Sequence, residues 1–230
     1  MTIKLLILLT IFSTVQLITN IHAVSSKYSN FLVLKGQNVT GNRYENPFFG
    51  ISIEKPNDWH SKSFSEIRAL LKLVQPLSLA SNNKSLEQKF KNKIERSIPI
   101  FNFVKNRLSS VYSSDNPSIL VLAEKLEAAP DVKNSCDYIM YSREMLQNPF
   151  MKLTSTSDCH DVNLNGEQYG MQEQSVNIFN SININQTQYV KFTNNDFILC
   201  FTLNYFNDDT KNEVDNIMRT IKFSKELFLC

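Results

Sequence analysis

Glycine is scarce in this 230-residue sequence, and the few glycines lie far apart. There are five, at positions 36, 41, 50, 166 and 170, so the chain has no glycine-rich loop that could hold a phosphate group. The G-x-S-x-G motif of serine hydrolases and the H-E-x-x-H motif of zinc proteases are also absent. Because these catalytic motifs are missing, we expect a protein that is not an enzyme and uses no cofactor.

The sequence also has no large excess of either charge. Lysine and arginine together number 24 and aspartate and glutamate 22, which gives a formal net charge of +2. A nearly neutral chain gives no electrostatic reason to expect nucleic acid or an anionic membrane as a partner. Basic residues cluster in KFKNKIER, residues 89–96, and we interpret this run as the solvated face of a helix.

Histidine is rare, and beyond residue 23 the sequence contains only His60 and His160. We interpret His60 as a surface residue in a turn. His160 lies in SDCHD, residues 157–161, whose carboxylate, thiol and imidazole groups are all potential metal ligands. Since neighbours in a strand point to opposite faces, we predict no metal site and no catalytic residue here. A secreted hydrolase or metal-dependent enzyme that uses Cys159 and His160 stays open as the alternative function.

Residues 1–23 resemble a cleavable signal peptide. The stretch reads MTIKLLILLTIFSTVQLITNIHA, with an early charge at Lys4, an apolar core and the small residue Ala23 at its end. Polar residues interrupt the apolar run, whereas a membrane span needs about 20 predominantly apolar residues. We therefore expect a protein secreted to an extracellular or periplasmic space, with no stable membrane span after cleavage. Residues 24–43 are expected to form an exposed lead, and residues 44–230 a single domain.

Four cysteines follow the predicted signal peptide, at Cys136, Cys159, Cys200 and Cys230. An even number in an exported chain suggests disulfides. Three pairings are possible, and we favour Cys136–Cys159 because these two flank one predicted helix and its following loop. That choice leaves Cys200 with Cys230, and the alternative is four free, buried thiols.

Three tripeptides match the acceptor pattern for N-glycosylation: NVT at Asn38, NKS at Asn83 and NQT at Asn185. Each requires a eukaryotic secretory route to be used. In a chain this rich in asparagine and serine such matches also arise by chance, so these sites do not identify the host.

The first half of the chain reads as one strand followed by helices. Residues 49–54 alternate between apolar and polar side chains, and Pro56 ends this predicted strand before a turn that carries Trp59. Ser63 and Glu66 have the spacing of a helix capping box, and Pro76 is expected to end that helix. A second helix is predicted from Ser85, with residues 100–108 continuing it after a break at Pro99. The absence of glycine between residues 50 and 166 favours a helical middle.

The second half reads mostly as strands. A buried strand is predicted within 115–127 and a helix at 136–146. Strands are predicted at 167–180, 182–193 and 197–206, and the last of these is the strongest strand signal in the chain because its phenylalanines and leucines share one face. Thr210 and Glu213 are expected to cap a final helix.

The order of these elements resembles the PsbP-like family, which is named for an extrinsic subunit of photosystem II. The resemblance lies in FGISIEKPNDW at 49–59, SILVLAEKL at 118–126, FILCFTLNYF at 197–206 and DNIMRTIKF at 215–223. It implies an α+β fold, an α/β/α sandwich around a central antiparallel sheet, here with an enlarged helical segment after the first strand. The same fold occurs in a Ran-GTPase release factor and in exported prokaryotic proteins of unknown role. It also implies a non-catalytic binding or assembly protein with a protein partner of unknown identity.

Aromatic residues cluster around the first predicted strand, at Tyr44, Phe48, Phe49 and Trp59. They could line a ligand cleft, but a hydrophobic core at this strand explains them more simply.

Overall fold

The structure is a computed structural model that describes residues 38–79, 84, 88, 93, 96–107, 116–126, 131–144, 151–178, 180–193 and 196–224. The predicted signal peptide, most of the predicted lead, Asn83 and Cys230 lie outside these residues. The described part is a mixed α+β fold with an eight-stranded and a four-stranded sheet, and every strand pair is antiparallel. The predicted α+β class and antiparallel sheet are confirmed.

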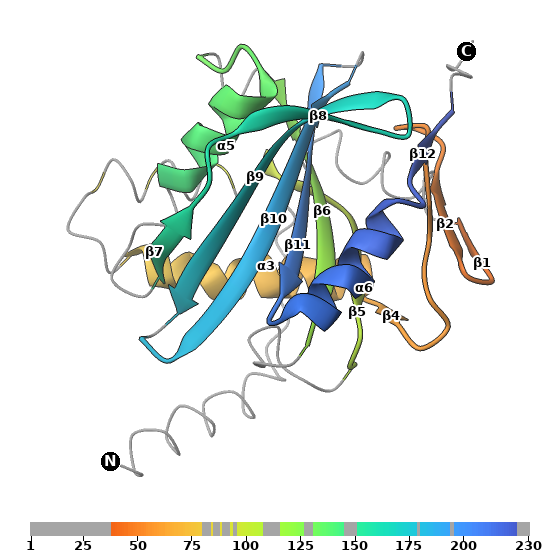
Figure 1. Ribbon diagram of the computed structural model, residues 1–230, viewed down its shortest axis with the longest axis horizontal. Coiled ribbons are helices and arrows are strands. Elements are labelled where there is room, and N and C mark those ends of the chain that lie inside the picture. Colours follow the sequence, from red (N-terminus) through yellow and green to blue (C-terminus); the bar gives the residue numbers. More distant parts are fainter. Residues whose placement is uncertain are drawn as a thin grey trace, which may run out of the picture.

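The large sheet has the strand order β4-β5-β6-β11-β10-β9-β7, and β8 also pairs with β9 (Figure 1). Its strands are β4 (His60–Ser61), β5 (Ile98–Val104), β6 (Ser118–Lys125), β7 (Met151–Thr156), β8 (His160–Leu164), β9 (Glu167–Ile178), β10 (Ile182–Phe192) and β11 (Phe197–Tyr205). The predicted strands over 167–180, 182–193 and 197–206 therefore correspond to β9, β10 and β11. They lie side by side, as expected for a meander.

The small sheet joins the two ends of the described chain. It has the order β1-β2-β3-β12, from β1 (Asn38–Thr40), β2 (Arg43–Asn46), β3 (Ile51–Glu54) and β12 (Lys222–Phe223). Strand β1 falls within the stretch that was predicted to be an exposed lead. Gly50 precedes β3 with a φ of +63°, and a Cβ there would lie 3.0 Å from the carbonyl oxygen of Ser224. The close approach of the C-terminal segment therefore requires glycine.

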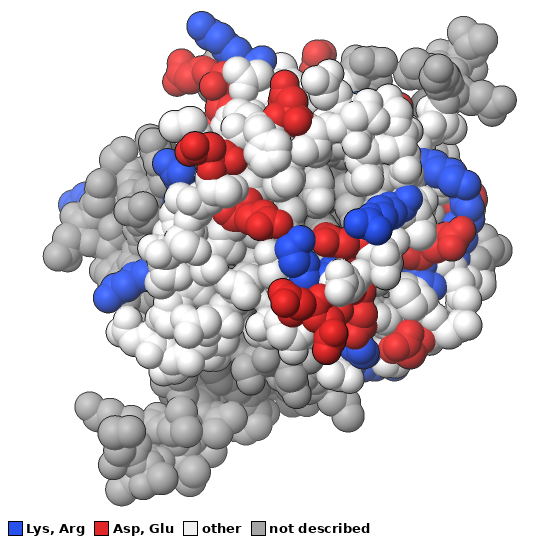
Figure 2. All heavy atoms as spheres, in the orientation of Figure 1, with Lys and Arg blue, Asp and Glu red and all other residues white. Residues whose placement is uncertain are grey.

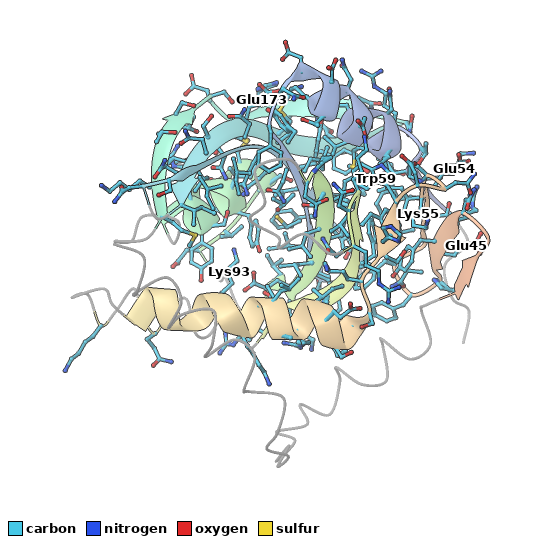
Figure 3. The ribbon with its side chains drawn as sticks, turned by 90° about the horizontal axis from the view of Figure 1, so that it is seen from below. Glu45, Glu54, Lys55, Trp59, Lys93 and Glu173 are labelled. Carbon is cyan, nitrogen blue, oxygen red and sulfur yellow. A yellow bond between two sulfur atoms is a disulfide. The ribbon has the colours of Figure 1, made fainter. Side chains whose placement is uncertain are left out.

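The described chain contains the helices α3 (Phe64–Leu79), α5 (Ser135–Glu144) and α6 (Asp208–Met218). Figure 3 shows α3 and α6 on opposite sides of the large sheet. Helix α6 buries Val214, Ile217 and Met218 in a core that also contains Phe201 and Leu203 of β11. Helix α5 packs on the other face, where Tyr138 and Ile139 contact a cluster with Val190 and Ile198. Because side chains alternate along β11, α6 packs on one face of the large sheet and α5 on the other.

Residues 98–104 correct the predicted helical middle. They form strand β5, which is buried along its whole length. The sequence IPIFNFV is rich in β-branched and aromatic residues, and a short apolar run of this kind is ambiguous between strand and helix. The register shifts between Pro99 and Phe101, so Pro99 lies at an irregularity where its missing N–H is tolerated.

Two predicted helix boundaries are also corrected. Helix α3 runs past Pro76 to Leu79, so Pro76 removes one backbone hydrogen bond without ending the helix. Helix α6 is capped by Asn207 and Thr210, not by Thr210 and Glu213. The Asn207 side chain accepts from the Thr210 N–H at 2.9 Å, and the Thr210 hydroxyl accepts from the Asn207 N–H at 3.1 Å. The predicted capping box of Ser63 and Glu66 at α3 is present.

The substitution Gly170→Ala tests the close packing of α5 on β9. A methyl group at this position would lie 2.7 Å from the Cβ of Ser135, so α5 would have to shift. We expect the free energy of unfolding to fall by about 1–3 kcal/mol, as is typical of overpacking. Urea unfolding followed by circular dichroism measures this change. Gln168→Ala, at an exposed position of the same strand, is the control, and equal losses for the two variants would contradict the packing.

Candidate functional site

The predicted disulfide Cys136–Cys159 is formed, with its Cα atoms 5.6 Å apart. It joins the start of α5 to the loop between β7 and β8, as the sequence indicated. The bond leaves Cys159 without a free thiol, so this residue cannot act as a nucleophile while the disulfide is intact. Cys200 carries a free thiol. Its predicted partner Cys230 lies outside the described residues, so the second pairing stays a prediction.

His160 is the first residue of β8 and is exposed. Its Nδ1 lies 3.3 Å from the carbonyl oxygen of Asp158. Within the described ranges no group of three or more histidine, cysteine, aspartate or glutamate side chains is arranged to hold a metal ion. His60, in β4, is exposed as well. The structure therefore does not bring Cys159 and His160 together with further ligands from described residues.

Two of the three possible glycosylation sites lie in described strands. Asn38 begins β1. Asn185 is half-buried in β10, and its Oδ1 accepts a hydrogen bond of 2.7 Å from the Ser175 hydroxyl. A glycan at any of these sites stays a prediction.

The aromatic cluster of the first strands belongs to the hydrophobic core. Tyr44, Phe49 and Trp59 are buried, and Phe48 packs against them while remaining partly exposed. The Tyr44 hydroxyl donates to the carbonyl oxygen of Ile100 at 2.9 Å, and burial raises its pKa to about 12. These rings therefore pack the two sheets together, as the simpler of the two interpretations predicted.

A groove lies between α6 and the turn that follows β3, with a volume of about 680 Å³. Residue Trp59 closes this turn, and its side chain is 2% exposed. The Lys55 ammonium donates to the carbonyl oxygens of Pro56 at 2.8 Å and of Trp59 at 2.6 Å, which fixes the shape of the turn (Figure 3). The Glu54 N–H donates to the hydroxyl of Thr220 at 2.9 Å. Both walls of the groove are thus tied together by hydrogen bonds.

Charges of both signs line the groove: Arg43, Lys55, Lys105, Glu54, Asp58 and Glu213. Lys105, which follows β5, lies 2.7 Å from a carboxylate oxygen of Glu213 on α6. Figure 2 shows acidic and basic side chains intermixed over α6. The side chains of Asn57, Asp58 and Asn216 make no hydrogen bond or ion pair with another described residue. They are exposed and available to a partner.

A second cluster of polar side chains is buried beneath α5. The Tyr138 hydroxyl donates to a carboxylate oxygen of Glu124 at 2.6 Å, and Glu124 is 2% exposed. The Lys93 ammonium lies 4.6 Å from the centre of the Tyr138 ring and 5.7 Å from that of Tyr141 (Figure 3). Lys93 is half-buried, which corrects the prediction that residues 89–96 form a solvated face at this position.

The environment of this cluster shifts three pKa values. Desolvation lowers the pKa of Lys93, and the negative charge of Glu124 partly opposes that change. Burial, followed by the charge of Glu124, raises the pKa of Tyr138. Burial also raises the pKa of the Cys200 thiol, which therefore has little thiolate character. Because the Tyr138–Glu124 contact is closed to solvent, we interpret it as structural.

Comparisons with known proteins concern the fold. No protein-family model and no curated protein matches the sequence. The solution structure of cyanobacterial PsbP (CyanoP) from Synechocystis sp. PCC 6803 is similar with a TM-score of 0.46 and 14% identity, over 81% of this chain and 98% of that chain. The crystal structure of LpqN, involved in cell envelope biogenesis of Mycobacterium tuberculosis, is similar with a TM-score of 0.35 and 13% identity, over 75% of this chain and 83% of that chain. The first of these structures belongs to the family that the sequence resembles, and at these TM-scores neither similarity carries an argument.

No helix within the described residues is both long and apolar enough to cross a membrane.

A double-mutant cycle on Tyr138→Phe and Glu124→Gln tests the buried contact. Removing the hydroxyl leaves a buried carboxylate with one donor fewer, so Tyr138→Phe should lower the free energy of unfolding by about 1.5–3 kcal/mol. We expect the double variant to lose less than the sum of the single losses, because the neutral amide of Glu124→Gln tolerates the loss of the Tyr138 hydroxyl better than the buried carboxylate does. Urea unfolding of the four proteins provides the numbers. Purely additive losses would show that the two side chains do not interact.

The raised pKa of Tyr138 makes the same contact pH-dependent. Its stabilising contribution is complete below pH 10.0, the ordinary pKa of tyrosine, and is lost as the pH rises from there towards the folded-state pKa. Wild-type protein should therefore lose stability above pH 10 relative to Tyr138→Phe. Lys93 and Cys200 are present in both proteins, so the difference isolates Tyr138. If the difference in the free energy of unfolding between the two proteins stayed constant above pH 10, this assignment to Tyr138 would be wrong.

Proposed function

We propose that this protein is an exported, non-catalytic accessory protein that binds a protein partner at the groove between α6 and the turn after β3. The signal-like residues 1–23 support export, and the Cys136–Cys159 bond fits an oxidising compartment. We also propose that residues 44–230 form the α/β/α sandwich that the family resemblance implies.

The mixed charge of the groove is the observation that carries this proposal. Three basic and three acidic side chains line it, so neither a polyanion nor a simple cation is favoured. A polypeptide surface offers both charges together with backbone donors and acceptors, and complementary charges of this kind give specificity and speed to protein association. The exposed Asn57, Asp58 and Asn216 are the polar groups with which such a partner would pair.

The groove is also preorganised for binding. Its turn is held by the bonds from Lys55, and the hydrogen bond between Glu54 and Thr220 connects its two sides. A surface that is already ordered loses little conformational entropy on association. The buried Trp59 beneath the turn supports the same rigidity.

Photo-crosslinking from the groove tests the proposal. With a photoreactive residue in place of Asn216, we expect one discrete protein adduct from the envelope or medium of the host. Asp58→Lys, which reverses a charge in the groove, should weaken this association by about tenfold or more. Asp131→Lys, the same change at an exposed position outside the groove, should leave it intact. Equal adducts from both variants, or no adduct, would contradict the assignment.

A further inference from the structure

Two adjacent rows of polar side chains cross the large sheet on the face opposite α6. In one row Gln174, Gln186, Asn204 and Ser118 are direct cross-strand partners on β9, β10, β11 and β6. In the next row Gln172, Gln188 and Thr202 are partners on the first three of these strands, and Asn102 of β5 lies at the far end, beyond Leu120. We call these eight polar residues the polar band.

The polar band separates two hydrophobic clusters on the same face. One cluster lies under α5 and includes Val190 and Ile198. The other contains Met151, Val176 and Ile184. A sheet face covered by helices is normally apolar throughout, since burying polar groups costs free energy unless each is hydrogen-bonded. The two polar rows between these apolar clusters therefore cost free energy that hydrogen bonds have to offset.

Side-chain hydrogen bonds connect the first row across four strands. The amide of Gln174 donates to Gln186 at 2.8 Å, that of Gln186 donates to Asn204 at 2.7 Å, and that of Asn204 donates to the Ser118 hydroxyl at 2.9 Å. All donors point in one direction along the row. The side-chain oxygen of Gln174, at the end of this row, consequently has no donor within the part of the chain that the structure describes.

Two further side-chain oxygens of the band, those of Gln172 and Asn102, also lack a donor among the described residues. The amide of Gln172 donates to the backbone carbonyl of Ser157 at 2.6 Å, and that of Asn102 donates to the carbonyl of Ile119 at 3.2 Å. Gln172, Gln174 and Asn102 are only 2%, 3% and 4% exposed. Each unpaired buried acceptor costs about 1–3 kcal/mol, so all three favour an added donor.

Solvent reaches the middle of the band. Gln186, Thr202 and Asn204 are half-buried although they lie on the central strands β10 and β11. Helix α3 lies on this side of the sheet (Figure 3). The unpaired acceptors themselves are closed to solvent, so a ligand that enters at the half-buried centre has to displace side chains of the band to reach them.

We propose that the polar band binds a small, neutral, hydroxyl-rich ligand of the chemical class of sugars. The ligand is neutral because no member of the band is charged. It donates hydrogen bonds because the unpaired atoms are all acceptors. Hydroxyl groups both donate and accept, which suits side-chain amides that offer both functions. This site is separate from the groove, because the groove is formed by α6 on the opposite face.

Saccharide titrations of the full mature chain test this proposal. Glucose and N-acetylglucosamine serve as probes, and the side-chain amide signals of Gln174 and Gln186 are followed by ¹⁵N NMR. We expect at least one probe to shift these signals in a saturable way. This experiment uses wild-type protein, so its outcome does not depend on the folding of any variant.

A variant pair ties the binding to the band. Gln172→Leu with Gln174→Leu removes two of the unpaired acceptors and should weaken saccharide binding by about tenfold, the loss expected for two hydrogen bonds. Gln168→Leu, at an exposed position of the same strand, should bind as wild type does. If no probe shifts the signals, water alone occupies the band and the proposal is wrong. Equal affinity of the double variant and wild type would also overturn it.

Discussion

The cross-strand register of β9, β10, β11 and β6 is the constraint on which the rest of this structure depends. Side chains alternate between the two faces of a strand, so a shift of one residue would exchange the faces. The observed register pairs Phe201 with Val121 on one face and Asn204 with Ser118 on the other. It therefore separates an apolar surface, which binds α6, from a surface that is polar across two rows.

Both proposed binding regions follow from this separation. On the apolar face α6 buries Val214 and Ile217 and presents Glu213 to Lys105, which builds one side of the groove. On the other face α5 covers one end of the sheet, where the disulfide at Cys136 and the close approach of Gly170 hold it. The polar band lies beyond that helix. One regular sheet thus carries a charged groove and a neutral polar surface on opposite sides.

The sequence predicted those parts of the fold whose signals are local. Strand β11 was evident from its alternation, and the Cys136–Cys159 bond followed from two cysteines that flank one helix. Strand β5 was missed, because a short apolar run with Pro99 and no nearby glycine fits a helix as well as a strand. The polar band was missed for a different reason. Its glutamines alternate along β9 and β10, but only the register aligns them with Asn204 and Ser118, and the groove likewise collects residues from separate segments.

Nuclear Overhauser effects between side-chain amides test the register most directly. The observed pairing predicts contacts from the Gln186 amide protons to both Gln174 and Asn204, which hydrogen-bond to it at 2.8 and 2.7 Å. It also predicts no contact from these protons to Val214 of α6, which lies in the core on the opposite face. Contacts between Gln186 and Val214, without any to Asn204, would show that the strands are shifted by one residue and that the polar band does not exist.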